Sequence, residues 1–137
     1  MLIKLVDVIL PKTETPSASE VGVHKLIDGL MKEFCTKEER ENFVAGLDKA
    51  IAANTEDLTA YMTQLEKEAQ EHDKNAEGYG MRNYRTTAFF SQLKGMTWTG
   101  YFTSERVCSE FLAYDPIPGE YIGCYPLDKT EGRAWAE

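Results

Sequence analysis

Residues that build metal centres are scarce in this chain. It has two histidines, His24 and His72, and three cysteines, and neither a CxxC nor an HExxH spacing occurs. Zinc and related metals are bound by such residues at close spacing. The sequence therefore predicts no metal site and no cofactor held by this chain.

Long apolar runs and an excess of positive charge are also missing. No run approaches the roughly 18 apolar residues that a membrane-spanning helix needs. Lys and Arg number 15 against 23 Asp and Glu, which gives a net charge of −8. Because an acidic surface repels phosphate backbones and anionic lipids, we expect neither nucleic acid as a partner nor direct insertion into a membrane.

Signatures of catalysis are equally hard to find. The glycines of GYG and GMTWTG match neither the GxGxxG nor the GxxxxGK[ST] spacing that cradles phosphates. Most carboxylates fall on polar helix faces, where they keep the surface hydrated. The sequence thus predicts a protein that performs no reaction of its own.

An alternative interpretation depends on His24. This residue follows Val23 at the edge of an apolar helical stripe, where a histidine at the boundary of the core is the commoner situation. A stand-alone helical enzyme or small-ligand-binding protein would instead use His24 as a general base, beside Asp28 or Glu20 in a pocket between helices.

Helical periodicity accounts for most of what the chain does contain. Apolar residues recur every three or four positions up to about residue 112, and the alternation typical of strands is almost missing. In two of these segments the expected core positions are Val23, Leu26, Ile27, Leu30, Met31 and Phe34, and Phe43, Val44, Leu47, Ala50 and Ile51. The sequence predicts an all-α fold, a bundle of five or six helices in a single domain, with residues 1–113 as its helical core.

Capping motifs indicate where the helices begin. Ser17 with Glu20, and Thr36 with Glu39, have the spacing of a capping box, in which each residue's side chain binds the other's backbone N–H. Pro11 ends the first helix. Further helix starts are expected at Asn54 or Thr55, at about Tyr84, and after Thr103 or Ser104.

The segment after the last helix is of a different kind. From Tyr114 to Leu127 it reads YDPIPGEYIGCYPL, with three prolines and three tyrosines. Pro116 and Pro118 bias the residues before them toward extended backbone. We therefore expect an extended, Pro/Tyr-rich arm over residues 114–137, which loses little entropy on docking to a partner.

Aromatic residues are concentrated in the C-terminal third. Those within helical periodicity are predicted to close the core: Phe89, Phe102 and Phe111. Trp98 fits the core and the surface equally well. Those in non-periodic chain are predicted to contact a partner: Tyr121, Tyr125 and Trp135.

Three cysteines leave one thiol unpaired in any intrachain scheme. Cys124 has three alternatives: a bond to a partner chain, a buried free thiol, or a disulfide with Cys108 that closes a loop of about 16 residues and contributes about 3 kcal/mol. Cys35, near the end of a helical stripe, is predicted to lie in the core.

Three motifs together resemble one known family. They are DVILPKTETPSASEVGVHKLID, LKGMTWTGYFTSE, and YDPIPGEYIGCYPL followed by AWA, and they extend in that order from Asp7 to Ala136. In this pattern the chain is similar to the gluconate 2-dehydrogenase subunit 3 family. The resemblance implies a small, non-catalytic (gamma-type) accessory subunit of a bacterial sugar or sugar-acid dehydrogenase, an oxidoreductase complex.

The resemblance also implies partners and a location. Members accompany a large FAD-dependent subunit of the glucose-methanol-choline type, often with a cytochrome c subunit, and are thought to help the large subunit mature and be exported. FAD is thus expected in the partner, and the substrate, whether gluconate, a glucoside or another sugar, is chosen there. Members usually carry a twin-arginine leader, which MLIKLVDVILP does not resemble. We expect a periplasmic protein whose leader has been removed; a cytoplasmic chaperone of the precursor is the alternative.

The expected partner interface combines the second and third motifs. Tyr121 and Tyr125 are the expected anchors, and Cys124 is a candidate covalent link. The expected interface residues are Tyr101, Phe102, Thr103, Ser104, Glu105, Tyr114, Pro116, Pro118, Tyr121, Cys124, Tyr125 and Pro126.

Overall fold

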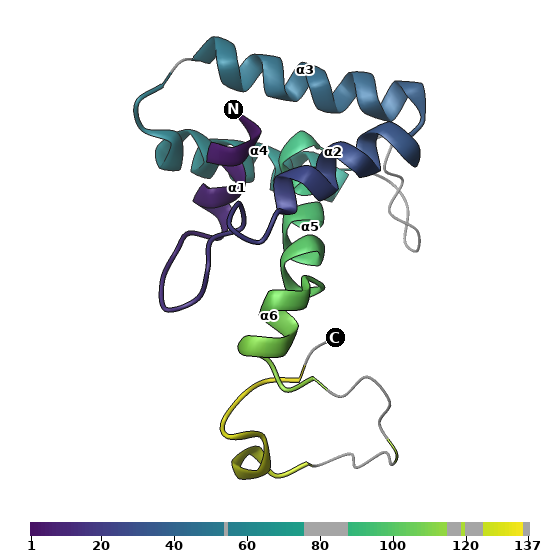
Figure 1. Ribbon diagram of the computed structural model, residues 1–137. Coiled ribbons are helices and arrows are strands. Elements are labelled where there is room, and N and C mark those ends of the chain that lie inside the picture. The colour runs from purple at the N-terminus through teal and green to yellow at the C-terminus, as the bar shows by residue number, and fades with distance from the viewer. Residues whose placement is uncertain (54, 76–87, 115–118, 120–124, 136–137) are drawn as a thin grey trace.

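The computed structural model describes residues 1–53, 55–75, 88–114, 119 and 125–135, and the described part is helical (Figure 1). Its elements are α1 (Leu2–Ile9), α2 (Val23–Glu33), α3 (Lys37–Ala53), α4 (Leu58–Asn75), α5 (Phe89–Phe102), α6 (Glu105–Glu110) and a short 3₁₀ helix, η1 (Leu127–Thr130). The predicted all-α fold is confirmed. None of the helices in these residues has the length and apolar character needed to cross a bilayer.

Helix α5 is the central element of the bundle. It contacts α1, α2, α3, α4 and α6, and it runs through the middle of the molecule in Figure 1. Phe90, Leu93, Thr97 and Tyr101 are buried along it, because a helix that is apolar on more than one face is most stable when its neighbours surround it. The hydroxyl of Thr97 donates to the carbonyl of Leu93 at 2.7 Å, which satisfies its polar atom inside the core.

The entry to α2 differs from the prediction. Ser17 and Glu20 do form the reciprocal capping box, with the Ser17 N–H donating to Glu20 at 3.0 Å and the Glu20 N–H to Ser17 at 3.4 Å. A further turn follows, however, and α2 begins only at Val23. Gly22, the N-cap, has φ +81°, a left-handed conformation that glycine adopts without the steric penalty of a side chain.

The second capping box behaves as predicted. The Thr36 N–H donates to the Glu39 carboxylate at 2.8 Å, the Glu39 N–H donates to Thr36 Oγ1 at 3.3 Å, and α3 begins at Lys37. The next helix, α4, begins later than predicted, at Leu58, and Asp57 provides its cap by accepting from the Ala60 N–H at 2.9 Å. Asn54, one of the two expected caps, lies outside the described residues.

Part of the predicted core is exposed. Val23, Ile27, Phe43 and Ala50 are buried, but the prediction is wrong for four residues that remain largely exposed: Leu26, Phe34, Val44 and Ile51. They follow the helical spacing correctly, but the described neighbours cover them only in part; Leu26, for example, reaches Gly100 of α5 with Cδ2 and is still 42% exposed. Periodicity identifies an apolar face, and only the packing decides how much of that face is buried.

The C-terminal elements follow the predicted order. Helix α6 starts after Ser104, whose Oγ accepts from the Val107 N–H at 3.4 Å, as the sequence indicates. The expected start of α5 near Tyr84 lies outside the described residues, and α5 is helical from Phe89. In Figure 1 the described part of the arm lies beyond α6, at the end of the molecule remote from α3.

Candidate functional site

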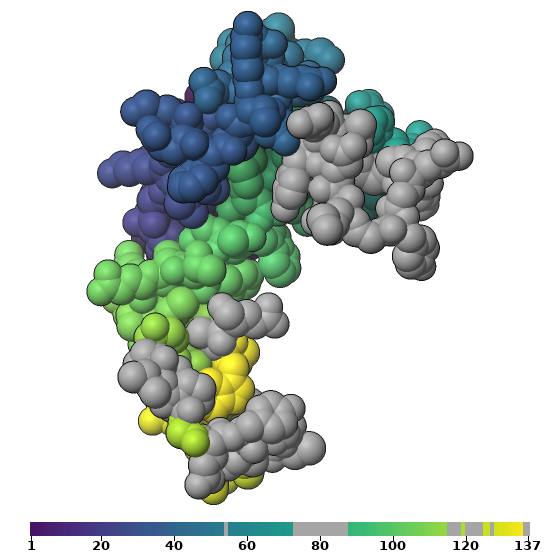
Figure 2. Space-filling view, turned by 90° about the vertical axis from the view of Figure 1, so that its right-hand side faces the viewer, coloured from purple at the N-terminus to yellow at the C-terminus, as the bar shows by residue number. Residues whose placement is uncertain are grey.

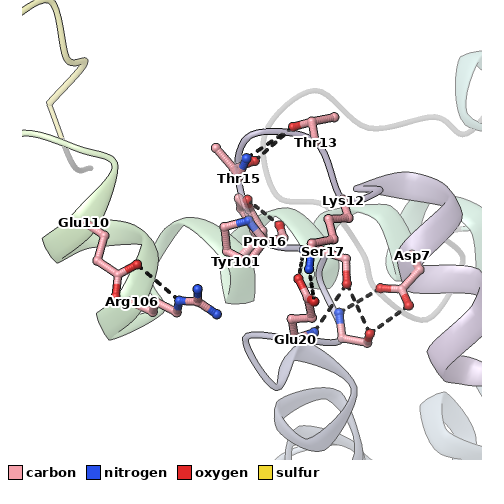
Figure 3. Close-up of polar contacts among 11 residues, drawn as sticks. Asp7, Lys12, Thr13, Thr15, Pro16, Ser17, Glu20, Tyr101, Arg106 and Glu110 are labelled. Atoms are coloured by element: carbon pink, nitrogen blue, oxygen red, sulfur yellow. Dashed lines mark hydrogen bonds and ion pairs between the residues drawn. The ribbon is translucent and has the colours of Figure 1, made fainter.

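The first predicted interface segment lies at the junction of α5 and α6, and part of it is internal. Tyr101 is only 5% exposed, and its hydroxyl donates to the carbonyl of Pro16 at 2.8 Å (Figure 3). Phe102 packs against the core, edge-on to the Tyr101 ring at 5.3 Å. The prediction that Tyr101 offers its ring to a partner is therefore wrong for this conformation, because the ring is already enclosed by the protein's own helices.

The next three residues connect the two helices. Ser104 donates its hydroxyl to the Tyr101 carbonyl at 2.7 Å besides capping α6, so its polar atoms are used internally. Thr103 and Glu105 are exposed. Trp98, one turn earlier on α5, is 48% exposed and meets the Phe102 ring at 5.4 Å. The surface at this junction is thus supplied by Trp98, Thr103 and Glu105.

The second predicted segment is described only in part. Tyr114 is 58% exposed and Tyr125 is 38% exposed, and Pro126 is also exposed. The remaining predicted interface residues lie outside the described residues and stay predictions: Pro116, Pro118, Tyr121 and Cys124.

The two ends of the arm meet. The Ala113 N–H donates to the Ala134 carbonyl at 2.7 Å, and Ala113 forms an isolated parallel bridge with Trp135. The rings of Tyr125 and Trp135 pack edge to face with centroids 5.5 Å apart. The described arm is therefore a loop closed at its base, where the sequence predicted a simply extended chain.

A cation lies beside this aromatic pair. Lys129, in η1, places its Nζ 5.8 Å from the centroid of the Tyr125 ring. Lys129 was not among the predicted interface residues, since a lone lysine in non-periodic chain carries no signal of its own. We call Tyr125, Lys129 and Trp135 the arm cluster.

The loop between α1 and α2 is fixed to the helices around it (Figure 3). The Asp7 carboxylate accepts from the N–H and the hydroxyl of Ser19 at 2.8 and 2.7 Å. Lys12 Nζ lies 2.6 Å from the carboxylate of Glu20, and the pKa of that carboxyl is lowered by this hydrogen bond, then by the Ser17 N–H, with a further contribution from the charge of Arg106 on α6.

The alternative site around His24 is only partly assembled. His24 is half-buried, and its Nδ1 is buried without a hydrogen-bond partner among the described residues. Asp28 and Glu20 are both exposed, and Glu20 is engaged with Lys12. The two carboxylates are thus not enclosed with the imidazole. In the described ranges, no group of three or more His, Cys, Asp or Glu side chains is placed to hold a metal ion.

Two of the thiols are described, and both are free. Cys108 is buried, and its Sγ donates to the Phe102 carbonyl at 3.0 Å. Cys35 is half-buried at the end of α2, which corrects the prediction of a core position. Burial raises the pKa of the Cys35 thiol, and the neighbouring Glu39 carboxylate raises it further.

Comparison with known families covers the helices and the start of the arm. The sequence model of the family described as gluconate 2-dehydrogenase subunit 3 matches residues 1–119. The chain belongs to the gluconate 2-dehydrogenase subunit 3 family. Neither the curated proteins nor the solved structures compared with it gave a match.

Membership of this family indicates that the protein contacts another polypeptide. The name denotes a subunit of a multi-subunit gluconate dehydrogenase, so contact with another polypeptide is part of what the family does. The matched residues contain α1 to α6, including the α5–α6 junction. The arm cluster lies beyond the match.

Proposed function

We propose that this protein is a non-catalytic small subunit that binds the large FAD-dependent subunit of a sugar or sugar-acid dehydrogenase of the glucose-methanol-choline type. It stabilises that subunit, helps it mature and accompanies its export to the periplasm. FAD and the substrate are held by the large subunit, and a cytochrome c subunit completes the complex.

The exposed aromatic residues of the arm carry this proposal. Tyr114, Tyr125 and Trp135 keep 58%, 38% and 47% of their surface in water. Large aromatic side chains release most free energy when they are withdrawn from water, and they are enriched at the energetic centres of protein interfaces. A partner that covers these three rings would bury them, whereas the protein's own helices leave them exposed.

The closure of the arm supports the same function. Its base is held by the bond between Ala113 and Ala134 and by the packing of Tyr125 on Trp135. A segment that is already ordered loses less conformational entropy on binding than a free tail. The α5–α6 junction, where Trp98 and Thr103 are exposed, is followed along the chain by α6 and then by the arm. We include this exposed surface in the contact with the large subunit.

Co-expression tests this function. The chain is produced with an affinity tag, alone and together with a flavoprotein dehydrogenase of the glucose-methanol-choline type from the same genome. The flavoprotein should co-purify with the tagged chain, carrying flavin absorbance and dehydrogenase activity with an artificial electron acceptor. The flavoprotein expressed without the chain should give less folded, flavin-loaded enzyme.

The chain alone provides the control. It should show neither flavin absorbance nor dehydrogenase activity. Flavin bound to the isolated chain in stoichiometric amount, or no co-purification of the flavoprotein, would overturn the assignment.

A further inference from the structure

We propose that the arm cluster, Tyr125, Lys129 and Trp135, is the element that recognises the partner, and that it takes a segment of the large subunit in which an apolar side chain is followed closely by a carboxylate. This inference rests on the proposed function and names the chemistry of its contact. It assigns to Lys129 and Trp135 a role in choosing the partner.

The apolar half of this recognition comes from the two rings. Tyr125 and Trp135 pack edge to face at 5.5 Å, yet each remains more than a third exposed. Edge-to-face packing fixes the two rings relative to each other and leaves ring surface available to a third group. Figure 2 shows part of this segment, in yellow, at the end of the molecule that lies beyond α6.

The charged half comes from Lys129. Its Nζ lies 5.8 Å from the Tyr125 ring centroid, and the lysine is exposed and makes no ion pair within the described part of the chain. The neighbouring cation, Arg133, is already paired with Glu131. In a chain of net charge −8, an unpaired ammonium beside an aromatic pair favours a carboxylate on the partner.

The cluster is also held in a defined position. η1 carries Lys129, and the Thr130 carbonyl accepts from the Arg133 N–H at 3.0 Å, which turns the chain back toward Trp135. Thr130 itself is buried. The Ala113–Ala134 bond then joins the end of the arm to Ala113, three residues after the end of α6. The three recognition groups are therefore fixed before the partner binds, which lowers the entropy lost on binding.

Binding measurements with four variants test the inference. Affinity for the co-expressed flavoprotein is measured for the wild-type chain and for Trp135→Ala and Lys129→Glu. Trp135→Ala and Lys129→Glu should each weaken binding by roughly tenfold or more, as expected for the centre of an interface. Ile51→Ala and Lys49→Glu are matched controls, because they remove an exposed apolar group and reverse an exposed lysine on α3; both should leave the affinity within about twofold.

Two further measurements distinguish loss of the Lys129 charge from unfolding as the cause of weaker binding. Raising the salt concentration should weaken binding of the wild type more than binding of Lys129→Met, since only the ammonium is screened. Circular dichroism and amide exchange of the helices should be the same for all variants, which excludes unfolding as the reason.

Each outcome is decisive. Wild-type affinity in Trp135→Ala or in Lys129→Glu overturns the inference and leaves the proposed function intact. Failure of the wild type to bind the flavoprotein overturns both. If sedimentation shows that the isolated chain dimerises and that Trp135→Ala dissociates the dimer, the cluster binds a second copy and the inference is wrong.

Discussion

The ring of Phe89 occupies the space that a side chain on Gly46 would need. A Cβ atom added to Gly46 would lie 2.3 Å from Cγ of Phe89, far inside van der Waals contact. The same ring packs against Phe43, with centroids 5.2 Å apart. The first turn of α5 therefore lies against α3 only because position 46 has no side chain.

The substitution Gly46→Ala tests this packing. The added methyl group must displace an aromatic ring in a packed region, so we expect the free energy of unfolding to fall by about 1–3 kcal/mol. Urea denaturation followed by circular dichroism measures the change. Gly95→Ala is the matched control, because nothing lies within 4 Å of its added Cβ; there the better helix propensity of alanine should stabilise the protein by about 0.5–1 kcal/mol. Equal stability of the two variants would contradict the explanation.

The hydrogen bond from Tyr101 to Pro16 connects α5 with the loop before α2. Tyr101→Phe removes the donor and leaves the buried carbonyl of Pro16 without it, so we expect a loss of about 1–2 kcal/mol. Tyr61→Phe is the control, since the hydroxyl of this half-buried tyrosine makes no hydrogen bond to the described residues. Its unfolding free energy should change by less than about 0.5 kcal/mol. A Tyr101→Phe variant as stable as its control would show that the bond contributes nothing.

The case of Tyr101 also shows what a sequence of this kind predicts and what it does not. Apolar spacing and capping residues were sufficient for the all-α fold, for the box at Thr36 and for the start of α6. Tyr101 was assigned to the partner interface because it lies in the second motif, and the buried series Phe90, Leu93, Thr97 and Tyr101 along α5 was not recognised. Thr97 can be buried because its hydroxyl donates a hydrogen bond to the Leu93 carbonyl.

The closure of the arm could not be predicted from spacing and capping residues, for a different reason. Its aromatic content and proline content predicted a docking segment, but the closure of Ala113 on Ala134 and the packing of Tyr125 on Trp135 are contacts between residues far apart in a non-periodic stretch. Likewise, spacing identified Val44 and Ile51 as apolar positions, and only the arrangement of neighbouring helices leaves them exposed.

Glu20 should give the protein a specific dependence on acid pH. Its folded-state pKa lies below the ordinary value of 4.5, chiefly because Lys12 Nζ donates to the carboxylate. A group with a lowered folded pKa stabilises the protein above its unfolded pKa, and that contribution is lost as the pH falls through the folded value. The stability difference between wild type and Glu20→Gln should therefore be present at neutral pH and narrow steadily below about pH 4.5.

Denaturation midpoints at a series of pH values measure this difference. Lys12→Met should flatten the dependence in the same range, because it removes the main cause of the shift. Since Glu20 is exposed, added salt should reduce the effect. A difference between wild type and Glu20→Gln that grows toward acid pH would reverse the sign and refute the assignment.

The described thiols should react slowly, and in a fixed order. The reactive species is the thiolate, so the raised pKa of Cys35, caused first by burial and then by Glu39, reduces its reaction with iodoacetamide at about pH 8 below that of an unfolded cysteine peptide. Cys108 should react more slowly still, because it is buried and its Sγ donates to the Phe102 carbonyl.

Peptide mass mapping after timed alkylation gives the two rates separately, and in denaturant both should rise to the rate of the free peptide. The same experiment decides among the alternatives for Cys124. If Cys108 remains unlabelled in denaturant until a reductant is added, it is held in a disulfide, and the free thiol described above is not the state of the protein in solution. If Cys108 labels in denaturant without reductant, a disulfide between Cys108 and Cys124 is excluded, and Cys124 is either a thiol or bonded to another chain.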